Sequence, residues 1–131
     1  RFPAYPTSIG RVLLAGLSRE RLAWYFDNVH VEALTEHTVA DRKRLEQIID
    51  ECRRSGYAAV EDELAFGVVA AAVPVVDNAG RVVAALNSSG HSKKMKKAQL
   101  VRDRLPMLRQ VSRQISQELA LVPGLSLSAQ S

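Results

Sequence analysis

A chain of 131 residues, 47% hydrophobic and 24% charged, has the size and composition of one globular domain, and it lacks any apolar run long enough to span a membrane. Its single cysteine excludes an internal disulfide and a metal site built on paired cysteines. The net charge of +4 is unevenly distributed along the chain: residues 1–90 carry 10 basic and 12 acidic side chains, whereas residues 91–131 carry 8 basic and 2 acidic ones. This C-terminal excess of basic residues is more typical of a solvated helix face than of a nucleic-acid surface.

The start of the chain predicts a soluble, cytoplasmic piece of a longer protein. Residues 1–5 lack the apolar core of a secretory signal, and the lone Cys52 fits a reducing compartment. Because the sequence does not begin with methionine, we expect a further segment before Arg1.

Two helices are predicted within the first thirty residues. Thr7 and Ser8 follow Pro6 as N-cap candidates, and an apolar run comes next, so that a helix should begin near Ser8. Free backbone N–H groups at such an end can seat a carboxylate or phosphate, although most helix N-termini bind only water. A second helix should begin after Ser18.

A third helix is predicted to start at the capping-box-like segment Thr38–Asp41 and to close at Gly56. Its apolar positions recur at spacings of three and four and comprise Leu45, Ile48, Ile49 and Cys52. A cysteine on this buried stripe should have a raised pKa, so we do not expect Cys52 to act as a nucleophile.

A hairpin dominates the middle of the chain. Residues 57–60 predict a short strand, which the acidic cluster Glu61–Glu63 follows, and the runs Val68–Val76 and Arg81–Ser89 flank a turn at Asp77–Gly80. Five strand positions are alanine, and the second strand ends in polar residues. Two interpretations are equally favoured: a sheet packed closely under a helix, or the wall of a pocket.

The last predicted helix runs from about Lys97 to Leu121. Its apolar stripe contains Val101, Leu105, Leu108, Ser112, Ile115 and Leu119. Pro106 lies inside this pattern and should either kink the helix or mark its true first turn. Residues 122–131, rich in serine with a proline and a glycine, predict a flexible tail.

The sequence offers no catalytic or metal-binding arrangement. His30, His37 and His91 lack metal-ligand spacing and have no cysteine partners, and neither a G-x-S-x-G elbow nor a glycine-rich phosphate loop occurs. We therefore expect no metal, no cofactor and no enzymatic activity.

Short motifs occur in a characteristic order that covers nearly the whole chain up to about Leu119. They are Phe2–Tyr5, Thr7–Ala15, Thr35 with Thr38, Arg53–Tyr57, Asp62–Leu64, Gly67–Val68, Ala72–Val75, Asp77–Asn87 and Leu105–Pro106. Together they resemble the C-terminal effector-binding domain of the IclR family of bacterial transcriptional regulators. At Lys96 the chain departs from the family pattern, in which a Ser or Thr helix cap is common.

The resemblance implies an α+β fold over residues 1–121, with a curved antiparallel sheet flanked by helices as in GAF-type sensors. It also implies a module that binds a small organic acid, forms dimers or tetramers and modulates DNA binding by a winged helix-turn-helix that this chain lacks. The T-S-x-G-R-V-L-L-A motif most resembles the branch that responds to aromatic acids. The alternatives are a GAF-like small-molecule domain of a signalling enzyme and a purely structural dimerisation domain.

In the family, the ligand lies between the sheet and the loop that enters the first helix. The positions carried over by motif are Ser8, Ile9, Gly10, Glu61, Val68, Ala70, Asn87 and Ser89. Strand alternation agrees independently, because it places Val68 with Ala70 on one face of the first hairpin strand and Asn87 with Ser89 on one face of the second.

Overall fold

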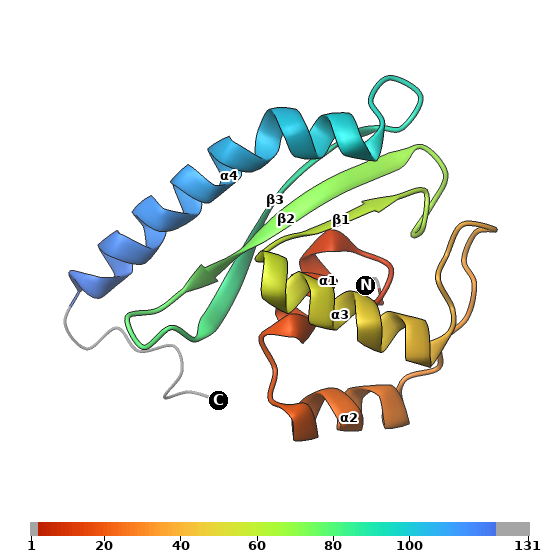
Figure 1. Cartoon of the computed structure of the whole chain (residues 1–131), viewed down its shortest axis with the longest axis horizontal. Coiled ribbons are helices and arrows are strands. Elements are labelled where there is room, and N and C mark those ends of the chain that lie inside the picture. Colours follow the sequence, from red (N-terminus) through yellow and green to blue (C-terminus); the bar gives the residue numbers. More distant parts are fainter. Residues whose placement is uncertain (1–2, 123–131) are drawn as a thin grey trace.

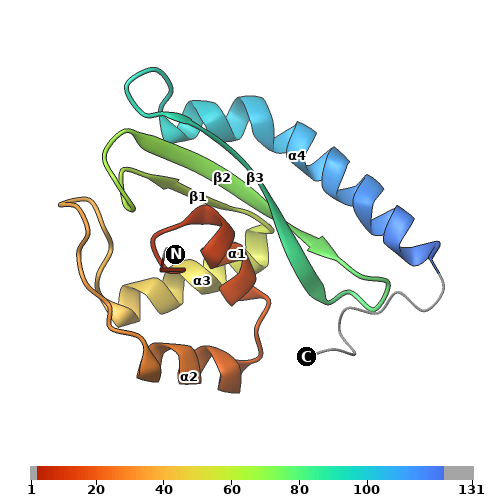
Figure 2. The same ribbon diagram turned by 180° about the vertical axis from the view of Figure 1, so that it is seen from behind.

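Helices cover both faces of a small antiparallel sheet in the computed structural model, which describes residues 3–122 (Figure 1). Helix α4 lies along one face, whereas α1 and α3 lie on the other, with α2 outside them (Figure 2). The elements, in chain order, are α1 (Ser8–Ala15), α2 (Arg19–Asn28), α3 (Arg42–Ser55), β1 (Ala58–Glu61), β2 (Val68–Val76), β3 (Val82–His91) and α4 (Lys97–Ala120).

The strands lie in the order β1-β2-β3, so β2 forms the centre of the sheet. The N–H of Asp62 donates to the carbonyl of Val68 at 2.8 Å, and the even-numbered residues of β2 therefore bond toward β1. Pro74 has no N–H and would face the same way, but β1 pairs only as far as Ala72. The missing N–H of Pro74 therefore interrupts no hydrogen bond between β1 and β2. Strands β2 and β3 pair antiparallel, which confirms the predicted hairpin.

Side-chain caps begin the first three helices, as predicted for two of them. Thr7 accepts from the N–H of Gly10, and Ser18 accepts from the N–H of Arg21. The predicted capping box at Thr38 is wrong, because Asp41 caps α3 instead. The Thr38 hydroxyl donates to the carbonyl of Glu63 at 2.5 Å and so ties two loops together.

The core is divided by the sheet. The α4 face holds a cluster formed by Val69, Ala71, Val73, Leu100, Leu105 and Leu108. On the other face, a second cluster joins α1, α3 and the sheet through Val12, Cys52, Ala58 and Ala72. A third cluster, formed by Tyr5, Phe26 and Leu45, fixes α2 and the N-terminal loop against α3.

Helix α4 begins at Lys97 as predicted, but its N-cap residue does not supply the capping hydrogen bond. Lys96 at its N-cap makes no side-chain cap bond, and the Glu61 carboxylate accepts from the N–H of Lys97 at 2.7 Å. A residue of β1 therefore supplies the cap that Lys96 cannot. Pro106 lies nine residues into the helix, so the prediction that it marks the first turn is wrong. Of the predicted tail, only Val122 is among the described residues.

Candidate functional site

A cavity of about 480 Å³ lies between the N-terminal end of α1 and the sheet. We refer to it as the α1 cavity. Most of its walls are apolar, and its polar groups come from the first turn of α1 and from β3. The lining residues are Pro3, Ala4, Pro6, Thr7, Ser8, Ile9, Gly10, Leu13, Val60, Leu64, Val68, Ala70, Asn87 and Ser89.

The strand register explains how the sheet contributes to this cavity. Ala70 lies between Val60 of β1 and Ser89 of β3 in the ladder, so the three side chains point to the same face. The methyl group of Ala70 occupies little volume, which leaves space between the sheet and the N-terminal end of α1. Seven of the eight predicted positions line this cavity.

The first turn of α1 presents unused donors to the cavity. Thr7 Oγ1 accepts from the N–H of Gly10 at 2.9 Å, whereas the N–H groups of Ser8 and Ile9 have no partner among the described residues. Gly10 is required by close packing, since a Cβ there would lie 2.1 Å from the carbonyl oxygen of Ala4. An anion could therefore meet the two free amides of Ser8 and Ile9.

Strand β3 presents polar side chains at the other end of the cavity. Asn87 and Ser89 are exposed, and their side chains make no hydrogen bond with any described residue. Ser88 points to the opposite face, where it accepts from Arg104 Nη1 at 2.7 Å. The amide and hydroxyl of the first pair are thus available to a ligand.

Glu61 is the one predicted position that the structure does not bring to this cavity. Its neighbour Val60 faces the cavity, and strand alternation turns Glu61 toward α4, where it caps Lys97. Capping of α4 is therefore the structural role of this carboxylate.

The alanines of the hairpin serve both of the predicted purposes, close packing against helices and the wall of a pocket, at different positions. Ala70 lines the cavity, whereas Ala72 and Ala85 pack against α1 and Ala71 packs against α4. Small side chains permit close helix approach at three positions and leave open space at one.

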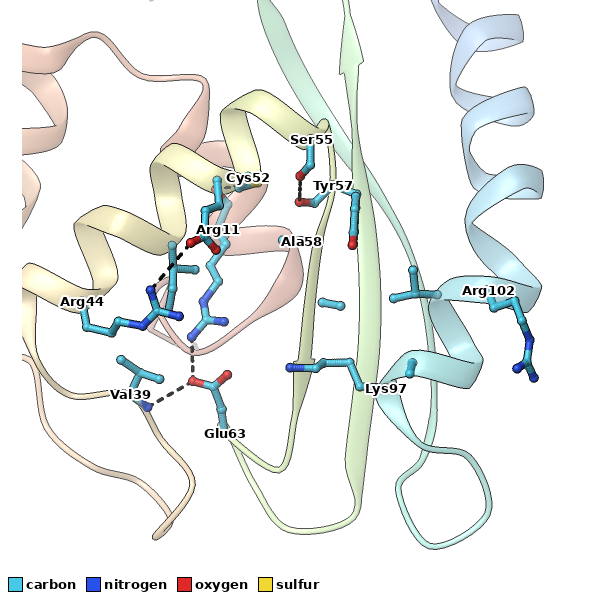
Figure 3. A pocket seen from close by; sticks show the side chains of 15 residues that line it. Arg11, Val39, Arg44, Cys52, Ser55, Tyr57, Ala58, Glu63, Lys97 and Arg102 are labelled. Carbon is cyan, nitrogen blue, oxygen red and sulfur yellow. Dashed lines mark hydrogen bonds and ion pairs between the residues drawn. The ribbon is translucent and has the colours of Figure 1, made fainter.

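A buried ion pair, which sequence inspection did not identify, links segments around α1 without lining the α1 cavity. Arg11 is 3% exposed and donates through Nη2 to Glu63 Oε1 at 2.6 Å and through Nε to the Tyr5 carbonyl at 2.8 Å. Glu63 Oε1 also accepts from the N–H of Val39 at 3.1 Å (Figure 3). The pair therefore connects α1 with the N-terminal loop, the segment before α3 and the loop after β1.

No chemistry typical of catalysis accompanies these groups. Within residues 3–122, no cluster of three or more potential metal ligands occurs, and no helix is long and apolar enough to cross a membrane. Burial raises the pKa of the Cys52 thiol to about 11, although Arg11 and Arg53 oppose the shift. The thiol is therefore protonated at neutral pH, as the sequence predicted.

Comparison with known proteins identifies the relatives of this chain. Residues 1–117 match the family described as bacterial transcriptional regulator IclR C-terminal. The Pca regulon regulatory protein of Pseudomonas putida is 37% identical over 119 residues, which are 91% of this chain and 41% of that protein. The chain thus spans about two-fifths of the length of such relatives.

Solved structures of other regulators share the fold. The inducer-binding domain of the Acinetobacter transcription factor PobR, solved as a double mutant with 3-hydroxybenzoic acid, superposes with a TM-score of 0.85 at 33% identity, covering 93% of this chain and 70% of that one. The C-terminal domain of the Escherichia coli regulator KdgR gives 0.81 at 32% identity, covering 89% and 71%. These matches confirm the predicted α+β, GAF-like class of fold and indicate a regulatory domain rather than an enzyme.

Proposed function

The chain belongs to the family of bacterial transcriptional regulators that share the IclR C-terminal domain, and from this premise we propose that the α1 cavity binds a small organic acid. Aromatic acids are the first candidates. The supporting relatives are a regulator of the Pca regulon and a PobR domain solved with 3-hydroxybenzoic acid.

One observation carries the proposal: two sets of polar groups, far apart in the sequence and without partners among residues 3–122, line the same mostly apolar cavity. The free N–H groups of Ser8 and Ile9 suit a carboxylate, and the side chains of Asn87 and Ser89 suit a hydroxyl at the other end. A volume of about 480 Å³ lies within the range typical of small-ligand pockets. Leu13 and Val68 would contact the apolar body of the acid.

Residues outside the binding site would pass the effect of the bound acid on to DNA binding. We propose that residues 1–121 act as the effector-binding domain and that the assembled protein is a homodimer or homotetramer. Effector binding would then modulate DNA binding by a winged helix-turn-helix in the rest of the protein. The proposal that DNA binding is modulated is supported by the relatives, which are named as regulatory proteins.

Thermal shift and calorimetry with 3-hydroxybenzoate, 4-hydroxybenzoate, protocatechuate and pyruvate test the ligand class. At least one acid should raise the melting temperature of the chain, because a ligand that binds only the folded state stabilises it. Benzamide, which lacks the carboxylate, should not. If none of the acids stabilises the chain, the proposal fails.

Paired variants test the site itself. Asn87→Ala and Ser89→Ala should each weaken binding about fivefold, the effect of losing one hydrogen bond worth about 1 kcal/mol. Ser88→Ala is the matched control, because its hydroxyl lies on the opposite face of the same strand. Equal affinities in all three variants would favour a purely structural role for this face.

A further inference from the structure

A second opening lies on the far side of α1, along the outer edge of β1 between α3 and α4 (Figure 3). We call it the edge groove. It has a volume of about 620 Å³ and shares no lining residue with the α1 cavity. Its lining residues are Arg11, Val39, Arg44, Ile48, Glu51, Cys52, Ser55, Tyr57, Ala58, Ala59, Glu63, Lys97, Ala98, Val101 and Arg102.

One end of the edge groove is cationic. Arg11 uses Nη2 in the buried pair and Nε in its bond to the Tyr5 carbonyl, and Nη1 bonds to no described residue. The Lys97 ammonium has no carboxylate within 4.0 Å among the described residues, and Arg44 reaches Glu51 only at 3.7 Å. Figure 3 shows these three basic side chains directed toward the same end of the groove, beside Glu63.

Among the residues that line this end, three basic side chains face two acidic ones, Glu51 and Glu63. The Glu61 carboxylate lies nearby but does not line the groove, and it accepts from the backbone N–H of Lys97. Arg102 is not part of this end, since its side chain points away and lies 3.2 Å from Asp103 (Figure 3). A ligand carboxylate could accept from the Lys97 ammonium and from the free guanidinium N–H of Arg11.

The remainder of the edge groove is mostly apolar, with Ser55 and Arg102 as its polar residues. Ile48 and Cys52 come from α3, Tyr57 and Ala59 from the β1 side, and Val101 from α4. Burial keeps the Cys52 thiol neutral at physiological pH, so this wall carries no charge there. A compact apolar lining with a few convergent polar groups is the usual composition of a small-molecule site.

We propose that the edge groove is a second ligand site, which takes an amphipathic monocarboxylate. The carboxylate binds among Arg11, Arg44 and Lys97, and the apolar body lies against Tyr57 and Val101. Because α1 separates the two openings, this site and the α1 cavity can be occupied independently. The inference concerns a different surface from the proposed effector site and does not depend on it.

The test is an NMR titration of the ¹⁵N-labelled chain with 3-phenylpropionate, with neutral 3-phenylpropionamide as the comparison. The acid should cause saturable shifts of the amide resonances of Tyr57, Ala59 and Val101, and the amide compound should not. Lys97→Met should weaken this binding tenfold or more, because it removes a charge-assisted contact. Lys94→Met is the matched control, an exposed lysine three residues earlier that does not line the groove.

Arg44→Met provides a second variant on α3 and should weaken the same binding without affecting the cap of α4. Shifts confined to Ser8, Asn87 and Ser89 would assign the acid to the α1 cavity alone and overturn the proposal. Equal responses to the acid and its amide, or equal affinities in Lys97→Met and Lys94→Met, would also overturn it.

Discussion

The two faces of the sheet differ in what accompanies their apolar packing, although alternate residues of one strand build both. On the α4 face, Val69, Ala71 and Val73 pack against three leucines of α4. On the α1 face, Ala72 belongs to a second apolar cluster, whereas Ala70 borders open space. The buried Arg11–Glu63 pair links the loops beside this face.

This difference depends on which part of α1 meets the sheet. Ala72 clusters with Val12, farther along the helix, whereas Ala70 shares the cavity with the first residues of α1. Two alternate positions of one strand therefore face, in turn, a packed helix and the space beside the N-terminal end of that helix.

The largest expected effect on stability comes from breaking the Arg11–Glu63 ion pair. Arg11→Met should lower the free energy of unfolding by about 3–5 kcal/mol, because it leaves Glu63 as an uncompensated buried carboxylate. Urea denaturation followed by circular dichroism measures it. The double variant Arg11→Met with Glu63→Gln should recover part of the loss. A loss in the double variant equal to the sum of both single losses would show that the pair is not coupled.

Removing a leucine from the α4 face should cost slightly less. Leu100→Ala should lower the free energy of unfolding by about 2–5 kcal/mol, since the side chain is fully buried against the sheet. Met107→Ala is the control on the same helix, because Met107 is 50% exposed and should change stability far less. Equal losses in the two variants would contradict the packing described for α4.

Enlarging adjacent alanines compares the two faces directly. Ala71→Leu should destabilise the fold by about 1–3 kcal/mol, since it overpacks the α4 face. Ala70→Leu should destabilise less, because its side chain can extend into the α1 cavity, and it should abolish stabilisation by any acid that binds there. Thermal melts with and without 3-hydroxybenzoate measure both. If the two variants lose stability equally, the α1 face is as tightly filled as the other.

The smallest expected effect concerns the loop at the end of the sheet. Hydrogen bonds from the Ser92 hydroxyl and the Gly67 N–H hold the pKa of Asp62 below its ordinary value of 3.8. Because the folded-state pKa is the lower one, the ionised carboxylate stabilises the fold above pH 3.8, and this contribution is lost as the pH falls further. The difference between urea midpoints at pH 7 and pH 3 should therefore be smaller in Asp62→Asn than in the native chain.

Asparagine suits this position, because the backbone of residue 62 has a φ of 59°. Asp103→Asn is the control, since the Asp103 carboxylate is itself exposed and pairs with the exposed Arg102. A pH difference that is unchanged in Asp62→Asn would contradict the role given to this carboxylate.

The sequence alone predicted the elements and the faces of the hairpin strands. Local rules suffice for these features: Thr7, Ser18 and Gly56 end or begin helices through their own backbone and side-chain chemistry. Period-two alternation likewise assigned Ala70 and Asn87 to faces that the structure brings together.

Tertiary structure decided which of those residues share a cavity and which distant side chains pair. Glu61 faces α4 rather than the cavity, and Arg11 meets Glu63 across 52 positions of sequence. Neither fact has a local signal, because each depends on strand register and on burial between segments distant in the chain. Local periodicity determines where a side chain points, whereas packing determines what it meets there.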